Sequence, residues 1–160
     1  GGATPTIDAA VSLDIGSVRL RERLLHSDPP TASEVRDATA HVDALLAGSG
    51  VDLGSAATWI GVGGTATSLS ALAQGLASYD RAGVHGSVLP RSTLDALAAS
   101  LLASSVAQVL EYPTMVPGRA DVICAGALIA QLVGERTGLD LTVSESDILD
   151  GLVLGLLIAQ

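Results

Sequence analysis

The first residues that could do chemistry form a short glycine-rich turn. Gly63, Gly64 and Thr65 follow the apolar stretch 57–62 and precede a helical pattern of small residues. A strand that runs into such a turn and then a helix leaves backbone N–H groups unpaired at the positive end of the helix dipole. These groups attract phosphate oxygens, and the hydroxyl of Thr65 or Thr67 could add a donor. The alternative is a corner in which glycine only satisfies the backbone turn.

A second candidate for anion binding is a group of arginines. The chain contains no lysine, and Arg19, Arg21 and Arg23 occupy alternate positions, which places all three on one face of an extended strand. Because arginine pairs with phosphate through two hydrogen bonds, this stripe could hold a phosphorylated ligand. The alternative is a solvated strand face whose arginines pair with Asp14 or Glu22. The net charge of −9 argues against a protein that coats nucleic acid.

Several other kinds of site are disfavoured. Gly61, Gly63 and Ala66 fit the spacing of a dinucleotide-binding turn with Asp80 downstream, but a helical pattern fills the interval where that fold needs a second strand. The phosphate-binding loop that requires a lysine is excluded because the chain has none. The three histidines show no metal-ligand spacing, and the single cysteine, Cys124, is expected to be a small core residue.

The elements that must position these residues alternate between strands and helices, which predicts an α/β fold in one domain. Aliphatic side chains must form the core, because 48% of residues are hydrophobic but only 2% are aromatic. No apolar run of about 18 residues predicts a membrane span, and no signal segment is evident, so we expect a cytoplasmic protein. The expected strands are 11–24, 57–62, 85–89 and 141–143. The expected helices are 31–48, 67–77, two around Leu94–Leu101 and Val106–Leu110, a buried helix at 122–133 and a terminal helix at 147–157. The first of them begins with a capping box at Thr31 and Glu34.

Five segments in order along the chain resemble the exopolyphosphatase and guanosine pentaphosphate phosphohydrolase (Ppx/GppA) phosphatase family, in its actinobacterial form. As a set they are specific, although the glycine turn alone is not. The segments are Ser12–Leu20, Leu25–Thr31, the turn Gly63–Thr65 with Ser68–Gln74, Pro117–Ile123 and Val143–Gly151.

The resemblance implies an actin-like ATPase fold, with two ribonuclease-H-like lobes, each a mixed sheet with flanking helices, and an active site in the cleft between them. Residues 1–160 resemble the second lobe, without the first lobe and without the glycine loop that opens the second. The family's catalytic glutamate belongs to the first lobe, so no catalytic residue is carried over to this chain. The resemblance implies that part of the cleft wall is formed by Gly63, Gly64 and Thr65. It implies the same for Gly16, Ser17 and Arg19, on a strand that faces the cleft. Arg119 and Asp121 also match a family motif, but we expect a structural ion pair or cap there.

For the complete enzyme the resemblance implies attack of water on a terminal phosphoryl group of polyphosphate, assisted by a divalent metal, magnesium, that this chain alone does not hold. Guanosine pentaphosphate is the alternative substrate. A noncatalytic phosphate-binding or dimerisation module is the alternative function. The isolated chain is expected to be inactive, and to associate with itself through the strand edge that the missing hairpin would cover. No nucleic-acid or membrane partner is expected.

Overall fold

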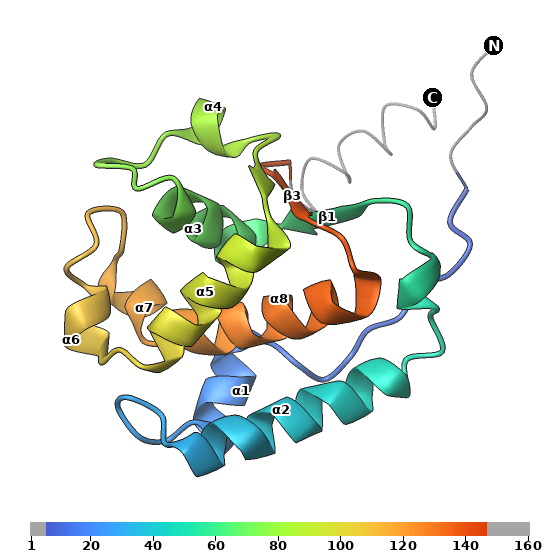
Figure 1. The fold of residues 1–160 in the computed structure, drawn as a ribbon, viewed down its shortest axis with the longest axis horizontal. Helices are drawn as coiled ribbons and strands as arrows, with labels where there is room; N and C mark the ends of the chain where they lie inside the picture. Colours follow the sequence, from blue (N-terminus) through green and yellow to red (C-terminus); the bar gives the residue numbers. More distant parts are fainter. Residues whose placement is uncertain (1–5, 147–160) are drawn as a thin grey trace, which may run out of the picture.

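A computed structural model of the chain describes residues 6–146, in which short strands alternate with helices (Figure 1). The helices and strands, in chain order, are α1 (Ser17–Leu24), α2 (Ala32–Ala47), the 3-10 helix η1 (Leu53–Ser55), β1 (Trp59–Val62), α3 (Gly63–Ala73), α4 (Arg81–Val84), β2 (Val88–Leu89), α5 (Arg91–Leu102), α6 (Val106–Val109), α7 (Pro117–Ala120), α8 (Ile123–Thr137) and β3 (Leu141–Ser144).

The three strands of the described residues form one mixed sheet in the order β1-β3-β2. β1 runs parallel to β3, with Trp59 beside Leu141 and Val62 beside Ser144. β2 is antiparallel to β3, with Leu89 beside Leu141. The carboxyl ends of β1 and β3 therefore lie at the same edge of the sheet, which is where ligands bind in many α/β proteins.

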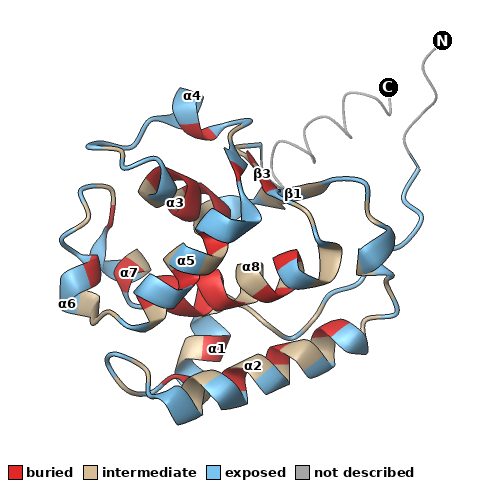
Figure 2. Ribbon diagram, viewed as in Figure 1, coloured by how far each residue is buried: buried red, intermediate tan, exposed pale blue. Residues whose placement is uncertain are grey.

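Helix α8 lies at the centre of the helical layers and packs against α1, α2, α3 and α5 (Figure 1). Its first two turns are buried almost all round, as Figure 2 shows. Small residues let its neighbours approach closely. A Cβ atom added to Gly126 would lie 2.6 Å from Cγ2 of Thr65 on α3, and one added to Gly134 would lie 3.1 Å from Cζ3 of Trp59 on β1. The expected buried helix is thus confirmed.

Helix α2 begins with the capping box that the sequence predicts. The Glu34 N–H donates to the Thr31 hydroxyl (3.3 Å), and the Glu34 carboxylate accepts from the Thr31 N–H (2.7 Å). The same carboxylate accepts from the N–H of His26 and Ser27. These hydrogen bonds, led by the one from Thr31, lower the pKa of Glu34 to about 2. Ala38, Val42 and Leu46 then bury one face of the helix.

The expectation of a strand over residues 11–24 is wrong, because residues 11–16 form no strand and Ser17–Leu24 form helix α1. Helical spacing brings Arg19 and Arg23 to one face, where both pair with Asp14. Arg21 points elsewhere and donates to the Ser27 carbonyl at 2.8 Å. The three arginines therefore do not share a face, and the phosphate-binding stripe is not formed.

The remaining boundaries agree with the sequence in most cases. The expected strands at 57–62, 85–89 and 141–143 correspond to β1, β2 and β3. Helix α3 begins at Gly63 rather than Thr67, so the glycines lie in its first turn. The four-residue helices α4 and α7 were not expected, because one turn shows no periodicity. The predicted terminal helix at 147–157 lies outside the described residues. In residues 6–146 no helix has both the length and the apolar character that crossing a membrane requires.

Candidate anion-binding site at the end of the sheet

The candidate site lies at the carboxyl ends of the parallel strands β1 and β3. Val62 and Ser144 are register partners at these ends, so the glycine turn that follows β1 lies beside the chain that follows β3. Gly63 adopts a φ of +78°, a conformation that glycine reaches without steric cost, and this turns the chain directly from β1 into α3. The turn that the sequence singled out is therefore the start of an 11-residue helix.

The first turn of α3 offers backbone donors. Its N-cap residue is Val62, whose side chain cannot accept a hydrogen bond, and no other side-chain cap is formed in the part of the chain that the structure describes. The N–H groups of the first turn of any α-helix lack partners within the helix and lie at the positive end of its dipole. This end of α3 is therefore electrostatically suited to an anion.

A guanidinium group lies directly on this turn. The Arg119 side chain from α7 occupies the space in front of Gly64, and a Cβ atom added there would lie only 2.5 Å from its Nη2 atom. Arg119 is half-buried and makes no ion pair with any residue in 6–146. The expected pairing of Arg119 with Asp121 is wrong, because Asp121 instead faces Arg21, with Oδ1 3.5 Å from Nε. Arg119 thus adds a positive charge where α3 presents its N–H groups.

Thr65 faces two neighbours. Its methyl group packs on Gly126 of α8, and the residue lines a hollow of about 270 Å³ beside β1. Gly16 and Ser17 line the same hollow, so the fold brings these three predicted site residues together. The walls are otherwise mainly apolar, with Trp59, Ile129, Val133 and Leu141 among them. Such walls suit an apolar occupant better than a phosphate.

The other predicted residues of the arginine segment have different positions from those expected. Gly16 is the N-cap of α1 and Ser17 is its first residue, rather than part of a strand. Arg19 is exposed and does not line the hollow; it pairs with Asp14. Hydrogen bonding from Arg23, together with the charge of Arg19, lowers the pKa of Asp14. Arg19 is therefore a surface ion-pair partner in this structure.

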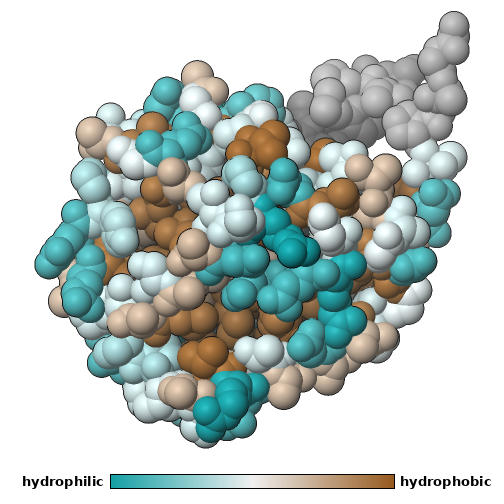
Figure 3. Space-filling model, in the orientation of Figure 1, coloured by the Kyte–Doolittle hydropathy of each residue, from teal (hydrophilic) through white to brown (hydrophobic). Residues whose placement is uncertain are grey.

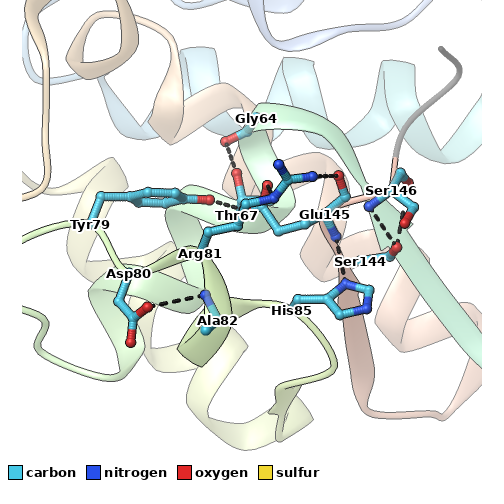
Figure 4. A network of polar contacts seen from close by, with 10 residues as sticks. All are labelled: Gly64, Thr67, Tyr79, Asp80, Arg81, Ala82, His85, Ser144, Glu145 and Ser146. Carbon is cyan, nitrogen blue, oxygen red and sulfur yellow. Dashed lines mark hydrogen bonds and ion pairs between the residues drawn. The ribbon is translucent and has the colours of Figure 1, made fainter. Parts of the chain in front are cut away.

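A polar network fixes the chain that follows β3 (Figure 4). Glu145 accepts a hydrogen bond from the Tyr79 hydroxyl, and its Oε2 lies 3.5 Å from Nε of Arg81. The Glu145 N–H donates to Nδ1 of His85 (3.1 Å), which places the ring proton of a neutral His85 on Nε2. Desolvation, followed by the hydrogen bond to Glu145, raises the pKa of Tyr79. The segment 79–85 is thus fastened to the end of the sheet beside the glycine turn.

The described residues do not assemble a metal site of their own. No group of three or more histidine, cysteine, aspartate or glutamate residues is close enough to hold an ion within residues 6–146. Glu145, the acid nearest to the end of β3, is already bound by Tyr79 and Arg81. Cys124 is buried in the core, as expected, and burial raises the pKa of its thiol.

A larger hollow of about 620 Å³ lies elsewhere, between α2, α5 and α8. Figure 3 shows apolar surface in this region, to which Val35, Leu102 and Leu132 contribute, with Arg36 at its margin. It shares no lining residue with the hollow beside β1. The hollow between α2, α5 and α8 is therefore not part of the candidate site at the glycine turn.

Comparison with known proteins identifies the family. Residues 2–155 match the Ppx/GppA phosphatase family. The chain belongs to this family. Exopolyphosphatase 2 of Mycobacterium tuberculosis is 48% identical over 155 residues, which cover 92% of this chain and 49% of that protein. The resemblance inferred from the five sequence segments is therefore confirmed.

Solved structures of Ppx/GppA proteins have the same fold. An exopolyphosphatase-like protein superposes with a TM-score of 0.84 at 38% identity, covering 89% of this chain and 48% of the other. The Aquifex aeolicus PPX-GPPA enzyme gives a TM-score of 0.86 at 28% identity, covering 94% and 50%. The predicted fold class, an actin-like fold with a mixed sheet and flanking helices, is confirmed. The chain spans about half the length of the relatives it matches.

Two features of the site escaped the sequence reasoning. The first is the contact between Arg119 and Gly64, which are far apart in the chain. The motif Pro117–Ile123 drew attention to Arg119, but the sequence suggested that Arg119 pairs with Asp121. The network around Glu145 likewise joins segment 79–85 to the residue after β3. Neither pairing leaves a periodic pattern that a single sequence reveals.

Proposed function

We propose that this chain forms the second lobe of a two-lobed exopolyphosphatase-type hydrolase that releases terminal phosphate from inorganic polyphosphate. The observation that supports this most strongly is the position of Arg119 on Gly64, at the uncapped start of α3 and at the carboxyl edge of the sheet. The similarity to Exopolyphosphatase 2 supports polyphosphate as the substrate. A cytoplasmic location is part of the same proposal.

In this proposal the chain binds and orients phosphate rather than activating water. The N–H groups of the first turn of α3 donate hydrogen bonds to phosphate oxygens, and the guanidinium of Arg119 compensates the negative charge of the phosphate. Donors that are already in position stabilise charge on the transferred oxygens at no cost of reorganisation during the reaction. The base that activates water is contributed by the other lobe, so the isolated chain binds polyphosphate without turning it over.

We assign no metal to the residues of this chain. The complete enzyme is expected to use a divalent metal, but the carboxylate of Glu145 is bound by Tyr79 and Arg81, and no cluster of ligands forms within residues 6–146. A carboxylate held by an arginine is a poor candidate ligand, because the guanidinium already neutralises it. No step of the proposed reaction is therefore routed through a metal held here.

The experiment measures binding of fluorescently labelled polyphosphate to the 160-residue chain, together with orthophosphate release. Arg119→Gln should weaken binding by about tenfold or more, since hydrogen bonds to charged groups contribute about 1.5–3 kcal/mol. Arg36→Gln on α2 is the matched control, because it removes the same charge from an exposed position outside the site. Equal losses in the two variants would refute a specific site and leave only a general charge effect.

The same titration separates the two candidate substrates. Guanosine pentaphosphate, offered as a competitor, should displace polyphosphate weakly if the site recognises a phosphate chain alone. Displacement at equal concentration would favour guanosine pentaphosphate phosphohydrolase activity. Rapid orthophosphate release by this chain alone would contradict the assignment of the base to the other lobe.

A further inference from the structure

Arg119 lies two positions before a carboxylate that could neutralise it. Asp121 directly follows α7, and its side chain is 59% exposed, so it is free to turn towards Arg119. A guanidinium that is paired with a carboxylate is less available to another anion. In residues 6–146 the two side chains nevertheless form no ion pair, and the guanidinium of Arg119 lies on Gly64 instead.

The carboxylate of Asp121 faces a different arginine. Its Oδ1 atom lies 3.5 Å from Nε of Arg21, whose side chain is only 12% exposed. Ion pairs between fully exposed groups contribute little to stability, but the charge of a partly buried group is screened less by water and salt. Arg21 therefore gives Asp121 a partner other than Arg119.

The fold holds Arg21 in place without help from Asp121. Its Nη1 atom donates to the carbonyl of Leu25 and, at 2.8 Å, to the carbonyl of Ser27. Both carbonyls follow the last turn of α1, where the helix dipole favours a cation. The start of α2 fixes the same segment, because the Glu34 carboxylate accepts a hydrogen bond from the Ser27 N–H (3.0 Å). The position of Arg21 is thus set by α1 and α2.

We propose that Arg21 is a positioning residue for phosphate binding, which occupies the carboxylate of Asp121 and so leaves Arg119 at the start of α3. This inference rests on the proposed function. Arg21 acts through Asp121 and does not itself touch the phosphate. Without Arg21, the cation nearest to Asp121 along the chain is Arg119. Pairing between these two residues would draw the guanidinium away from Gly64.

A double-mutant cycle on polyphosphate affinity, measured by isothermal titration calorimetry, tests this exchange of partners. Arg21→Gln should weaken binding about threefold more than Arg23→Gln, because an exposed ion pair is worth up to about 1 kcal/mol. Arg23→Gln is the matched control, since it removes the same charge from another face of α1, where Arg23 pairs with Asp14.

The second substitution, Asp121→Asn, separates partner exchange from a general effect of charge. It should change the affinity by less than about twofold in the original chain and in Arg23→Gln, but raise it about threefold in Arg21→Gln. The same change in all three backgrounds would overturn the proposal, because a general charge effect is additive.

The position of Arg119 can also be measured without a ligand. Nuclear Overhauser contacts should connect the Hε proton of Arg119 with the α protons of Gly64, because the guanidinium occupies the space in front of that residue. They should disappear in Arg21→Gln and return when Asp121→Asn is added. Contacts that persist in Arg21→Gln would contradict the proposal. If the original chain does not bind polyphosphate, the proposed function fails, and these contacts alone decide whether Arg21 positions Arg119.

Asp121→Asn in the original chain keeps the proposal refutable if Arg21→Gln fails to fold, which circular dichroism would reveal. This variant leaves the hydrogen bonds from Arg21 to Leu25 and Ser27 intact. Arg119 should therefore keep its contacts with Gly64. Loss of these contacts would show that Asp121 itself holds Arg119 in place, and would overturn the proposal.

Discussion

The substitution Gly64→Ala tests the relation between the glycine turn and Arg119. The added carbon would lie 2.5 Å from Nη2 of Arg119 and closer still to the other terminal nitrogen. Since non-bonded atoms are attracted only from about 3.5 Å outwards, the nearer nitrogen of the guanidinium must move by about 2 Å. It can do so cheaply because it is the end of a flexible side chain. Alanine also favours a helix over glycine by about 1 kcal/mol, so folding stability should not fall.

The expected result is a loss of polyphosphate affinity without a loss of stability. A displaced Arg119 forfeits a charge-assisted hydrogen bond of about 1.5–3 kcal/mol, which corresponds to roughly tenfold to hundredfold weaker binding. Gly118→Ala is the matched control, because it adds the same carbon beside Arg119 but meets no atom within 4 Å. Isothermal titration calorimetry measures the affinity and thermal denaturation the stability.

A double-mutant cycle makes this prediction refutable. If Gly64→Ala acts only by moving Arg119, it should have no further effect in the Arg119→Gln background. Additive losses would show that the two residues act separately. An unchanged affinity in Gly64→Ala would show that the present position of Arg119 does not matter for binding.

Three further predictions concern stability and titration. Glu34→Gln should lower the melting temperature at pH 7. The difference in melting temperature from the original chain should narrow as pH falls from about 4.5 towards 2, because the pKa of Glu34 is lowered in the folded state. A difference that stays constant when melting is measured across this pH range would contradict the prediction. Gly126→Ala should destabilise the fold by about 1–3 kcal/mol in urea denaturation, because the new Cβ lies 2.6 Å from Cγ2 of Thr65; unaltered stability would show that α3 and α8 can separate freely. Glu145→Gln should lower the pKa of Tyr79 only partly towards its ordinary value, since desolvation is the larger cause of the raised pKa. Ultraviolet titration measures the pKa of Tyr79, and Tyr79→Phe assigns the signal. An unchanged titration midpoint in Glu145→Gln would refute the contribution of Glu145.

The sequence predicted those parts of the fold that depend on neighbouring residues. The capping box of α2 needs only Thr31 and Glu34, three positions apart, and the apolar runs of β1 and β3 are short and bounded by turn residues. Helix α1 was taken for a strand because alternate arginines fit the strand period. The same segment also places Leu20 and Leu24 four residues apart, and burial of Leu20 against the core, with Asp14 pairing to Arg19 and Arg23, favours the helix.

The candidate site was predictable only in part, because only some of its features depend on residues that are neighbours in the chain. The glycine turn is a local pattern, so Gly63, Gly64 and Thr65 could be named, although α3 begins at Gly63 and not at Thr67 as expected. The approach of Arg119 to Gly64 depends on how α7 packs near α3, which no local pattern encodes. Gly16 and Ser17 reach the same hollow as Thr65, but from a helix start rather than a strand.

The central claim is that the start of α3, with Arg119 upon it, binds phosphate oxygens. Titration of the ¹⁵N-labelled chain with short-chain polyphosphate tests this most directly, because amide shifts report the binding groups themselves. The account predicts the largest shifts at the amides of Gly64, Thr65 and Ala66 and at the guanidinium of Arg119. Shifts centred instead on Arg36 and the hollow between α2 and α5, with the amides of α3 unmoved, would contradict it.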